Sequence, residues 1–197
     1  MSNEQVDLKR RRMLTAATAG VGAVGTVAMV VPFGMSLLPS EKAKAAGAPV
    51  EVDISMIEEG QQITVEWRGK PVWIVKRGDQ ALSDLPTLNG ELLDPESAAG
   101  QQPAYAQNEV RSIKPEISVL VGICTHLGCS PAYRPELAPA DLGDGWKGGY
   151  FCACHGSRFD LAGRVYKGVP APKNLEVPPH KYLSDTLILV GVDGGAV

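Results

Sequence analysis

The sequence predicts a mainly β, antiparallel domain that follows a single N-terminal transmembrane helix. Two observations support this fold class. Residues 13–38 contain no charged side chain, and from residue 50 onward short runs of apolar, often β-branched residues lie between Gly- and Pro-rich segments. With 197 residues, of which 44% are hydrophobic, the chain can form one core and an appendage but not two full enzyme domains.

The N-terminal segment has the features of a membrane anchor. Residues 1–12 are polar and end in three arginines, and the 26 residues that follow would form a helix of roughly 39 Å, longer than a hydrocarbon core of about 30 Å. Because the positive charge precedes the span, residues 1–12 are predicted to lie in the cytoplasm and the body of the chain in the periplasm. Residues 10–14 also resemble a twin-arginine export signal. We therefore expect residues 13–38 to be a single-pass anchor in a bacterial inner membrane.

A cleaved signal peptide is the alternative for this region. Ala43, Lys44 and Ala45 form a small-residue cleavage motif, which would give a soluble mature protein. Residues 39–49 contain no bulky apolar side chain and are predicted to be a flexible hinge. Residues 50–197 are then the exported domain.

Within this domain, the pattern predicts short strands and one inserted loop. Apolar and polar residues alternate over residues 61–67, as in a half-buried strand, whereas residues 186–192 are more continuously apolar, as in a buried one. Three prolines interrupt residues 79–109, which we interpret as an inserted loop with one or two short helices, and residues 130–147 are predicted to be a surface excursion. The predicted strands are residues 50–54, 61–67, 71–77, 117–122, 149–152, 164–166 and 186–192.

The exported domain is acidic. The first 49 residues contain six Lys/Arg and three Asp/Glu, which leaves 13 and 19 for the remainder, a net charge of −6. Such a charge disfavours binding to nucleic acid. It is compatible with electrostatic docking to a partner protein, and equally with simple solubility.

Two short stretches contain all four cysteines. Residues 124–129 read C-T-H-L-G-C and residues 152–157 read C-A-C-H-G-S. Thiolate and imidazole ligands together suit iron, zinc or copper. A zinc site fits poorly because six candidate ligands are present for a four-coordinate ion, and two plain disulfides would leave both histidines without a role. Gly128 and Gly156 can supply the backbone angles that such tight loops need.

These two stretches resemble the cluster-binding loops of Rieske iron–sulfur proteins. The additional Cys129 and Cys154 narrow the resemblance to the Rieske subunit of bacterial cytochrome bc complexes, in which a disulfide joins the loops. The resemblance implies an antiparallel β Rieske domain with a small cluster-binding subdomain and one [2Fe–2S] cluster. It makes Cys124 and Cys152 the thiolate ligands of one iron, and His126 and His155 the imidazole ligands of the other. It also implies a disulfide between Cys129 and Cys154.

The same resemblance implies a function in a respiratory chain. The chain would be the electron-transfer subunit of a quinol–cytochrome c oxidoreductase, a translocase, and would take one electron from a membrane quinol such as ubiquinol and pass it to a c-type cytochrome. Its partners would be cytochrome b and that cytochrome, with His155 as the quinol contact and proton acceptor. The alternative is a Rieske electron-transfer subunit of another periplasmic oxidoreductase, such as arsenite oxidase.

Residues around the ligands also match the family pattern, with one departure. Leu127 and Gly128 would form part of the apolar docking tip, and Gly156 belongs to the second loop. Pro170 lies in residues 168–172, which resemble the proline-rich loop that covers the cluster. In the family a Ser donates a hydrogen bond to a bridging sulfide and a Tyr two residues later donates one to a ligand thiolate. Here the pair is Ser157 and Phe159, so the second donor is missing. We therefore expect a reduction potential below that of the highest-potential members of the family.

A Rieske oxygenase is excluded because it needs a second domain with a two-His, one-carboxylate iron site. The only histidine outside the two loops is His180, which follows Pro178 and Pro179 and is predicted to be an exposed turn residue.

Overall fold

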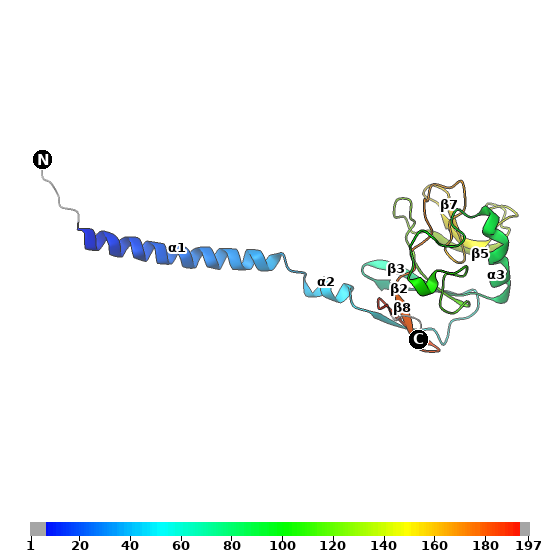
Figure 1. The fold of residues 1–197 in the computed structure, drawn as a ribbon, viewed down its shortest axis with the longest axis horizontal. Coiled ribbons are helices and arrows are strands. Elements are labelled where there is room, and N and C mark those ends of the chain that lie inside the picture. The colour runs from blue at the N-terminus through cyan, green and yellow to red at the C-terminus, as the bar shows by residue number, and fades with distance from the viewer. Residues whose placement is uncertain (1–6, 194–197) are drawn as a thin grey trace. The chain divides into compact units, whose positions relative to one another are not determined.

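The computed structural model describes residues 7–193, and the first six residues of the predicted cytoplasmic segment lie outside the described residues. The chain divides into two compact units, Met1–Ala45 and Ala46–Val197 (Figure 1). The second unit corresponds to the predicted exported domain.

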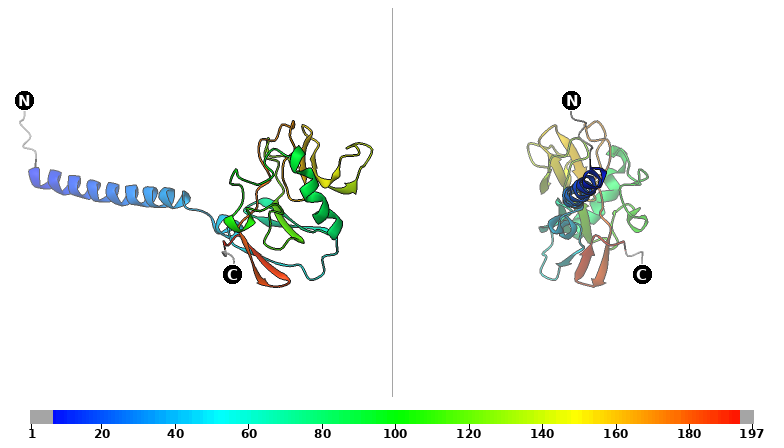
Figure 2. Two further views of the ribbon diagram at one scale, coloured as in Figure 1. Left: turned by 45° about the vertical axis from the view of Figure 1, so that its right-hand side comes forward. Right: turned by 90° about the vertical axis from the view of Figure 1, so that its left-hand side faces the viewer.

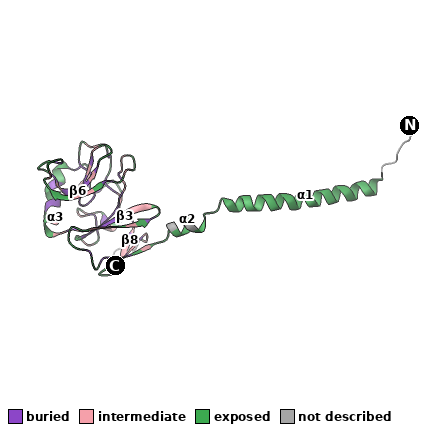
Figure 3. Cartoon of the chain, turned by 180° about the vertical axis from the view of Figure 1, so that it is seen from behind, coloured by how far each residue is buried: buried purple, intermediate pink, exposed green. Residues whose placement is uncertain are grey.

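The first unit consists of helix α1 (Leu8–Ser36) and most of the short helix α2 (Glu41–Ala46). Asp7 caps α1, because its carboxylate accepts hydrogen bonds from the main-chain N–H groups of Lys9 at 3.0 Å and Arg10 at 3.2 Å. No residue of α1 is buried, and Figure 3 shows its exposed surface along the whole length. With a mean hydropathy of 1.8 over its most apolar window, α1 is long and apolar enough to span a membrane.

The predicted hinge contains α2. The hydroxyl of Ser40 accepts a hydrogen bond from the N–H of Ala43 at 3.1 Å, and Lys44 pairs with Glu41 at 2.7 Å one turn earlier. A helix of only six residues has marginal stability of its own. Residues 39–49 therefore have local helical order with Gly and Pro on the C-terminal side.

The second unit contains three antiparallel sheets of three strands each, which confirms the predicted mainly β class. The first sheet has the order β1 (Val50–Asp53), β9 (Leu187–Val190), β8 (His180–Ser184). The second has the order β2 (Gln62–Trp67), β3 (Lys70–Lys76), β4 (Ile117–Val121), and the third β5 (Ala132–Leu137), β6 (Lys147–Cys152), β7 (Ser157–Asp160). Figure 2 shows the third sheet and the β8–β9 hairpin at opposite ends of this unit.

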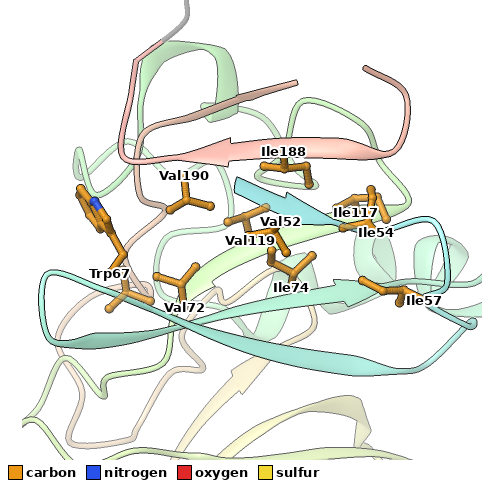
Figure 4. Close-up of a cluster of buried hydrophobic side chains, with 11 residues drawn as sticks. Val52, Ile54, Ile57, Trp67, Val72, Ile74, Ile117, Val119, Ile188 and Val190 are labelled. Atoms are coloured by element: carbon orange, nitrogen blue, oxygen red, sulfur yellow. The ribbon is translucent and has the colours of Figure 1, made fainter. Parts of the chain in front are cut away.

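The main core lies between the first two sheets. Figure 4 shows Ile188 and Val190 of β9 facing Val72 and Ile74 of β3, and all four side chains are fully buried. In β9 these buried positions alternate with half-buried ones, so β9 is more fully buried than β2, as the sequence indicated. Burial of such side chains is the main stabilising contribution to a small β domain.

Strand β5 lies inside the predicted surface excursion, so that prediction was wrong in part. Its residue Tyr133 pairs with Tyr150 of β6, and their rings lie 5.6 Å apart. Gly149 is essential to this sheet, because a Cβ at that position would collide with the carbonyl oxygen of Phe159 in β7. The predicted strand at residues 164–166 makes only two isolated bridges.

The inserted loop at residues 79–109 contains short helices, as predicted: α3 (Asp79–Asp84), η1 (Leu85–Glu91) and η2 (Ala104–Ala106). Leu88 and Leu92 pack against Trp146 and Tyr166. The buried guanidinium of Arg164, which follows β7, donates hydrogen bonds at 2.8 Å to the carbonyl oxygen of Leu85 and to the side chain of Asn89. The insertion therefore braces the third sheet, a role that the sequence did not reveal.

His180 is buried, with 1% of its surface exposed, and begins β8. The prediction of an exposed turn residue was wrong. The two prolines before it do not form a surface turn, because Tyr105 of the insertion covers this segment.

Candidate metal centre

The two cysteine-containing loops come from two different sheets. The first follows β4, and the second connects β6 to β7. Each loop closes on its own first cysteine: the N–H of Gly128 donates to the carbonyl of Cys124 at 3.0 Å, and that of Gly156 donates to the carbonyl of Cys152 at 2.9 Å. Both glycines have positive φ values, 86° and 79°, as the sequence predicted from their place in tight turns.

The two loops bring a pair of thiols together at the base of the site. Cys124 and Cys152 are both buried, free of disulfide bonds, and members of the same buried cluster. Burial raises the pKa of the Cys152 thiol and the neighbouring Cys124 raises it further, whereas main-chain N–H groups of Cys154 and His155 oppose the rise. A metal cation between the two sulfurs would replace the protons and favour the thiolate forms.

The two imidazoles form a second pair. The rings of His126 and His155 lie 4.7 Å apart between centroids, with an interplanar angle of 88°. His126 is half-buried and His155 exposed. The Nδ1 atom of His126 is buried and has no hydrogen-bond partner among the described residues. Such an orphaned ring nitrogen next to a second imidazole is what a metal ligand requires, so these residues fit a mixed Cys/His centre.

A disulfide joins Cys129 of the first loop to Cys154 of the second, as the sequence resemblance implied. The sulfurs of Cys129, Cys152 and Cys154 lie within 4.8 Å of one another. Two of these three sulfurs are already bonded to each other, so this trio is not a ligand set. The disulfide instead fixes the distance between the loops that present the free thiols and imidazoles.

A third segment, residues 168–172, closes against both loops. The hydroxyl oxygen of Ser157 accepts a hydrogen bond from the N–H of Ala171 at 3.1 Å, and Thr125 donates a hydrogen bond to the carbonyl of Lys173 at 2.6 Å. Sequence reasoning missed Thr125, although it stands between the first cysteine and the first histidine. Pro170, also in this segment, is exposed.

The remaining predicted residues divide between the surface and the core. Leu127 is 71% exposed at the end of the first loop. Phe159 is fully buried in an apolar cluster that also contains Cys124 and Cys152. Trp73, which the sequence did not single out, stacks on Tyr150 at 4.9 Å in the same cluster and forms part of the base beneath the thiols.

Comparison with known proteins identifies this arrangement. A family model described as "Rieske [2Fe-2S] domain" matches residues 49–179, and one described as "Ubiquitinol-cytochrome C reductase Fe-S subunit TAT signal" matches residues 1–40. The ubiquinol-cytochrome c reductase iron-sulfur subunit of Allochromatium vinosum is 58% identical over 196 residues, which cover 100% of this chain and 95% of that one.

The corresponding subunit of Bradyrhizobium diazoefficiens is 42% identical over 183 residues, which cover 92% of this chain and 94% of the relative. A solved chain described as "Hyperthermophilic respiratory Complex III" is 25% identical, with a TM-score of 0.48, and the match covers 88% of this chain and 98% of that one. On the evidence of the family models and the full-length relatives, the chain belongs to the family of Rieske iron–sulfur subunits of ubiquinol–cytochrome c reductase, the membrane-anchored electron-transfer subunits of cytochrome bc complexes.

Proposed function

We propose that Cys124 and Cys152 bind one iron, and His126 and His155 the other iron, of a single [2Fe–2S] cluster. One observation carries this proposal: two free, buried thiols and two edge-to-face imidazoles, one with an orphaned Nδ1, lie on two loops that a disulfide holds together. When bound, such a cluster supplies a one-electron redox couple whose potential is raised by its two imidazole ligands.

The two histidines and their neighbours then have different tasks. His155 is exposed and can contact a quinol and accept a proton from it, whereas His126 is half-buried. Leu127 and Gly128 present an exposed apolar tip to the partner that exchanges electrons with the site. The hydroxyl oxygen of Ser157 accepts a hydrogen bond from the main-chain N–H of Ala171, so the hydroxyl can donate its own hydrogen to a sulfide of the cluster.

We infer that the subunit takes one electron from ubiquinol and passes it to a c-type cytochrome, with cytochrome b as the second protein partner. The printed names of the relatives support this assignment, and they include a mitochondrial cytochrome b-c1 complex subunit of Solanum tuberosum that is 41% identical over 164 residues. A single cluster is sufficient, because only one set of Cys and His residues is available in the sequence.

We further propose that residues 13–38 anchor the chain in the inner membrane, residues 39–49 act as the hinge, and residues 50–197 lie in the periplasm. The three arginines at the N-terminal end of α1, before the uncharged residues 13–38, support this orientation. Replacement of Ala45 by Pro should slow electron delivery to the cytochrome while leaving the cluster spectrum intact. Unchanged turnover in this variant would contradict a mobile hinge, and a mature N-terminus near residue 46 would contradict a retained anchor.

Iron and sulfide analysis of the purified subunit, combined with electron paramagnetic resonance of the reduced protein, tests the cluster assignment. We expect two irons and two sulfides per chain and the spectrum of a mixed Cys/His centre. Cys124→Ser and His126→Ala should abolish that spectrum, whereas the matched loop variant Leu127→Ala should retain it. Stoichiometric zinc without a paramagnetic signal would overturn the proposal.

A further inference from the structure

Charge is unevenly distributed within the exported domain. Residues 123–173, which include all three loops of the site, contain six Lys/Arg and four Asp/Glu, a net charge of +2. The rest of the domain, residues 50–122 and 174–197, contains seven Lys/Arg and 15 Asp/Glu, a net charge of −8. The sequence segment that carries the site is therefore net positive, although the domain as a whole is acidic and residues 79–109, which pack against the third sheet, contain six Asp/Glu and no Lys/Arg.

Half of the cations in residues 123–173 are neutralised locally. Arg134 pairs with Asp141 at 2.8 Å, Arg164 with Asp160 at 2.7 Å, and Lys147 lies 3.6 Å from Asp84. The other three cations make no ion pair within residues 7–193, the part of the chain that the structure describes. We call them the basic rim: Arg158, Lys167 and Lys173.

The basic rim borders the site on two sides. Arg158 follows the second loop and alternates in β7 with Ser157 and Phe159, so its side chain projects from the opposite face of the strand. Lys167 and Lys173 flank the proline-rich loop, and the carbonyl of Lys173 accepts the hydrogen bond from Thr125 beside His126. All three cations thus lie around the loops that present the two histidines.

Two members of the rim share a hollow of about 510 Å³ next to the second loop. Its lining includes Arg158, Lys167, Tyr166 and Gly156, the residue after His155. The Nζ atom of Lys167 donates a hydrogen bond to the carbonyl of Gly90 at 2.8 Å, which holds this cation in position. Glu91 is the single carboxylate of the lining, so the two cations exceed it in charge.

We infer that the basic rim docks on an acidic surface of the redox partner, with a partner carboxylate entering the hollow between Arg158 and Lys167. This inference rests on the proposed function, because it assumes that the exposed tip around Leu127 meets a protein that exchanges electrons with the site. An Arg and a Lys that line one hollow favour a carboxylate over a neutral group. An anionic bilayer surface offers the same charge, and the lipid comparison below distinguishes it from a protein partner.

The position of the basic rim also bears on how the domain approaches its partner. In the field of an acidic partner, the three rim cations beside the site are attracted, which favours encounters in which the site faces the partner. Charges at the border of an interface mainly change the rate of association and its dependence on salt. The basic rim should therefore control how fast productive docking occurs, and not whether the cluster is bound.

Charge reversal in the intact, purified complex tests this inference. Electron delivery from the reduced cluster to the cytochrome would be followed after rapid mixing with quinol, at low and high salt, for Arg158→Glu, Lys167→Glu and the double variant. We expect the double variant to be slower by about tenfold at low salt, with the difference shrinking at high salt. Lys181→Glu in β8, which also removes a cation that makes no ion pair among residues 7–193, is the matched control and should behave as the wild type.

Electron paramagnetic resonance of each variant separates this inference from the cluster assignment. An intact cluster spectrum with slow electron delivery supports docking through the basic rim, whereas wild-type rates at all salt concentrations in the double variant would overturn it. If a Glu variant loses its cluster, the double variant Arg158→Gln, Lys167→Gln takes its place. Independently of any variant, a rate of electron delivery in the wild-type protein that does not change with salt would refute the inference. An effect that appears only in anionic lipid nanodiscs, and not in neutral ones, would assign the rim to lipid headgroups and also overturn it.

Discussion

The hydroxyl of Tyr105 makes two hydrogen bonds with the main chain of His180: it donates to the carbonyl oxygen at 2.8 Å and accepts from the N–H at 2.7 Å. Their rings meet edge to face, with centroids 5.5 Å apart. The Nδ1 atom of His180 lies 2.9 Å from the carbonyl oxygen of Pro178, so the neutral ring is held with Nδ1–H as the donor. The contact between Tyr105 and His180 ties the inserted loop to β8, the first strand of the C-terminal hairpin.

His180 should make the domain less stable in acid. Its burial lowers the pKa of the imidazole below the usual value of 6.5, so the folded chain resists a proton that the unfolded chain binds. The free energy of unfolding should therefore fall as the pH drops below about 6.5, and the loss should be complete below the folded-state pKa. Denaturant titrations of residues 46–197 from pH 8 to pH 5 measure this slope. His180→Gln should flatten it, and an unchanged slope in that variant would contradict the assignment.

The strands with a clear period of two were predictable from the sequence, and those that depend on distant partners were not. Residues 61–67 alternate because Trp67 turns into the core and Glu66 faces solvent, which is a local property of one strand. Strand β5 contains Pro135 and charged side chains, and it exists because it pairs with β6 and because Tyr133 packs on Tyr150. His180 was misjudged for the same reason, since Tyr105 lies 75 residues away in the sequence.

The meeting of the two cysteine-containing loops was more predictable than the fold around them. A Cys or His ligand is defined by its own chemistry and by a spacing of two or three residues, which a linear motif records directly. The contacts that fix those loops, such as Thr125 to Lys173 over 48 residues, are hydrogen bonds of common residue types and have no comparable signature. The basic rim was hidden as well, because the net charge of the domain does not show which cations lie without an ion pair beside the loops.

Asp160 and Arg164 form a buried ion pair whose loss should weaken the support of the third sheet. Asp160 accepts hydrogen bonds from Arg164 Nε at 2.7 Å and from the main-chain N–H of Ala162 at 2.9 Å, and both charged side chains are fully buried. Asp160→Asn leaves the guanidinium without its counter-charge and should cost about 3–5 kcal/mol of unfolding free energy. The exposed pair of Arg134 and Asp141 provides the control, because Asp141→Asn should leave the stability nearly unchanged. Equal effects of the two substitutions in denaturant titrations would argue against this account.

The disulfide should matter more for retention of the cluster than for its formation. It closes a segment of 25 residues, for which the chain-entropy model gives about 3–4 kcal/mol. Replacing both Cys129 and Cys154 by Ser removes the link but none of the proposed ligands, so the cluster should assemble and then be lost faster. The decay of its visible absorbance in air measures this rate, with Leu127→Ala as the control in the same loop. Wild-type decay in the double Ser variant would show that the link does not hold the two loops in place.

Phe159 should limit the reduction potential of the site. It lies on the same face of β7 as Ser157, is fully buried, and shares its apolar cluster with the thiols of Cys124 and Cys152. A Tyr hydroxyl at this position would be buried in the cluster that contains the cysteine sulfurs. A cysteine thiolate is the acceptor there that suits its hydrogen bond. Such a hydrogen bond stabilises the reduced, more negative form more than the oxidised form.

We therefore expect Phe159→Tyr to raise the midpoint potential. One hydrogen bond contributes about 0.5–1.5 kcal/mol, which for a one-electron couple corresponds to about 20–65 mV. Ser157→Ala should shift the potential in the opposite direction, because it removes the hydroxyl that can donate to a sulfide. Phe151→Tyr adds the same hydroxyl on the adjacent strand, where Phe151 packs in a different cluster, and should leave the potential unchanged. Protein-film voltammetry compares all three variants with the wild type. An unchanged or lower potential in Phe159→Tyr would mean that the ring of residue 159 does not point its para position at a ligand sulfur.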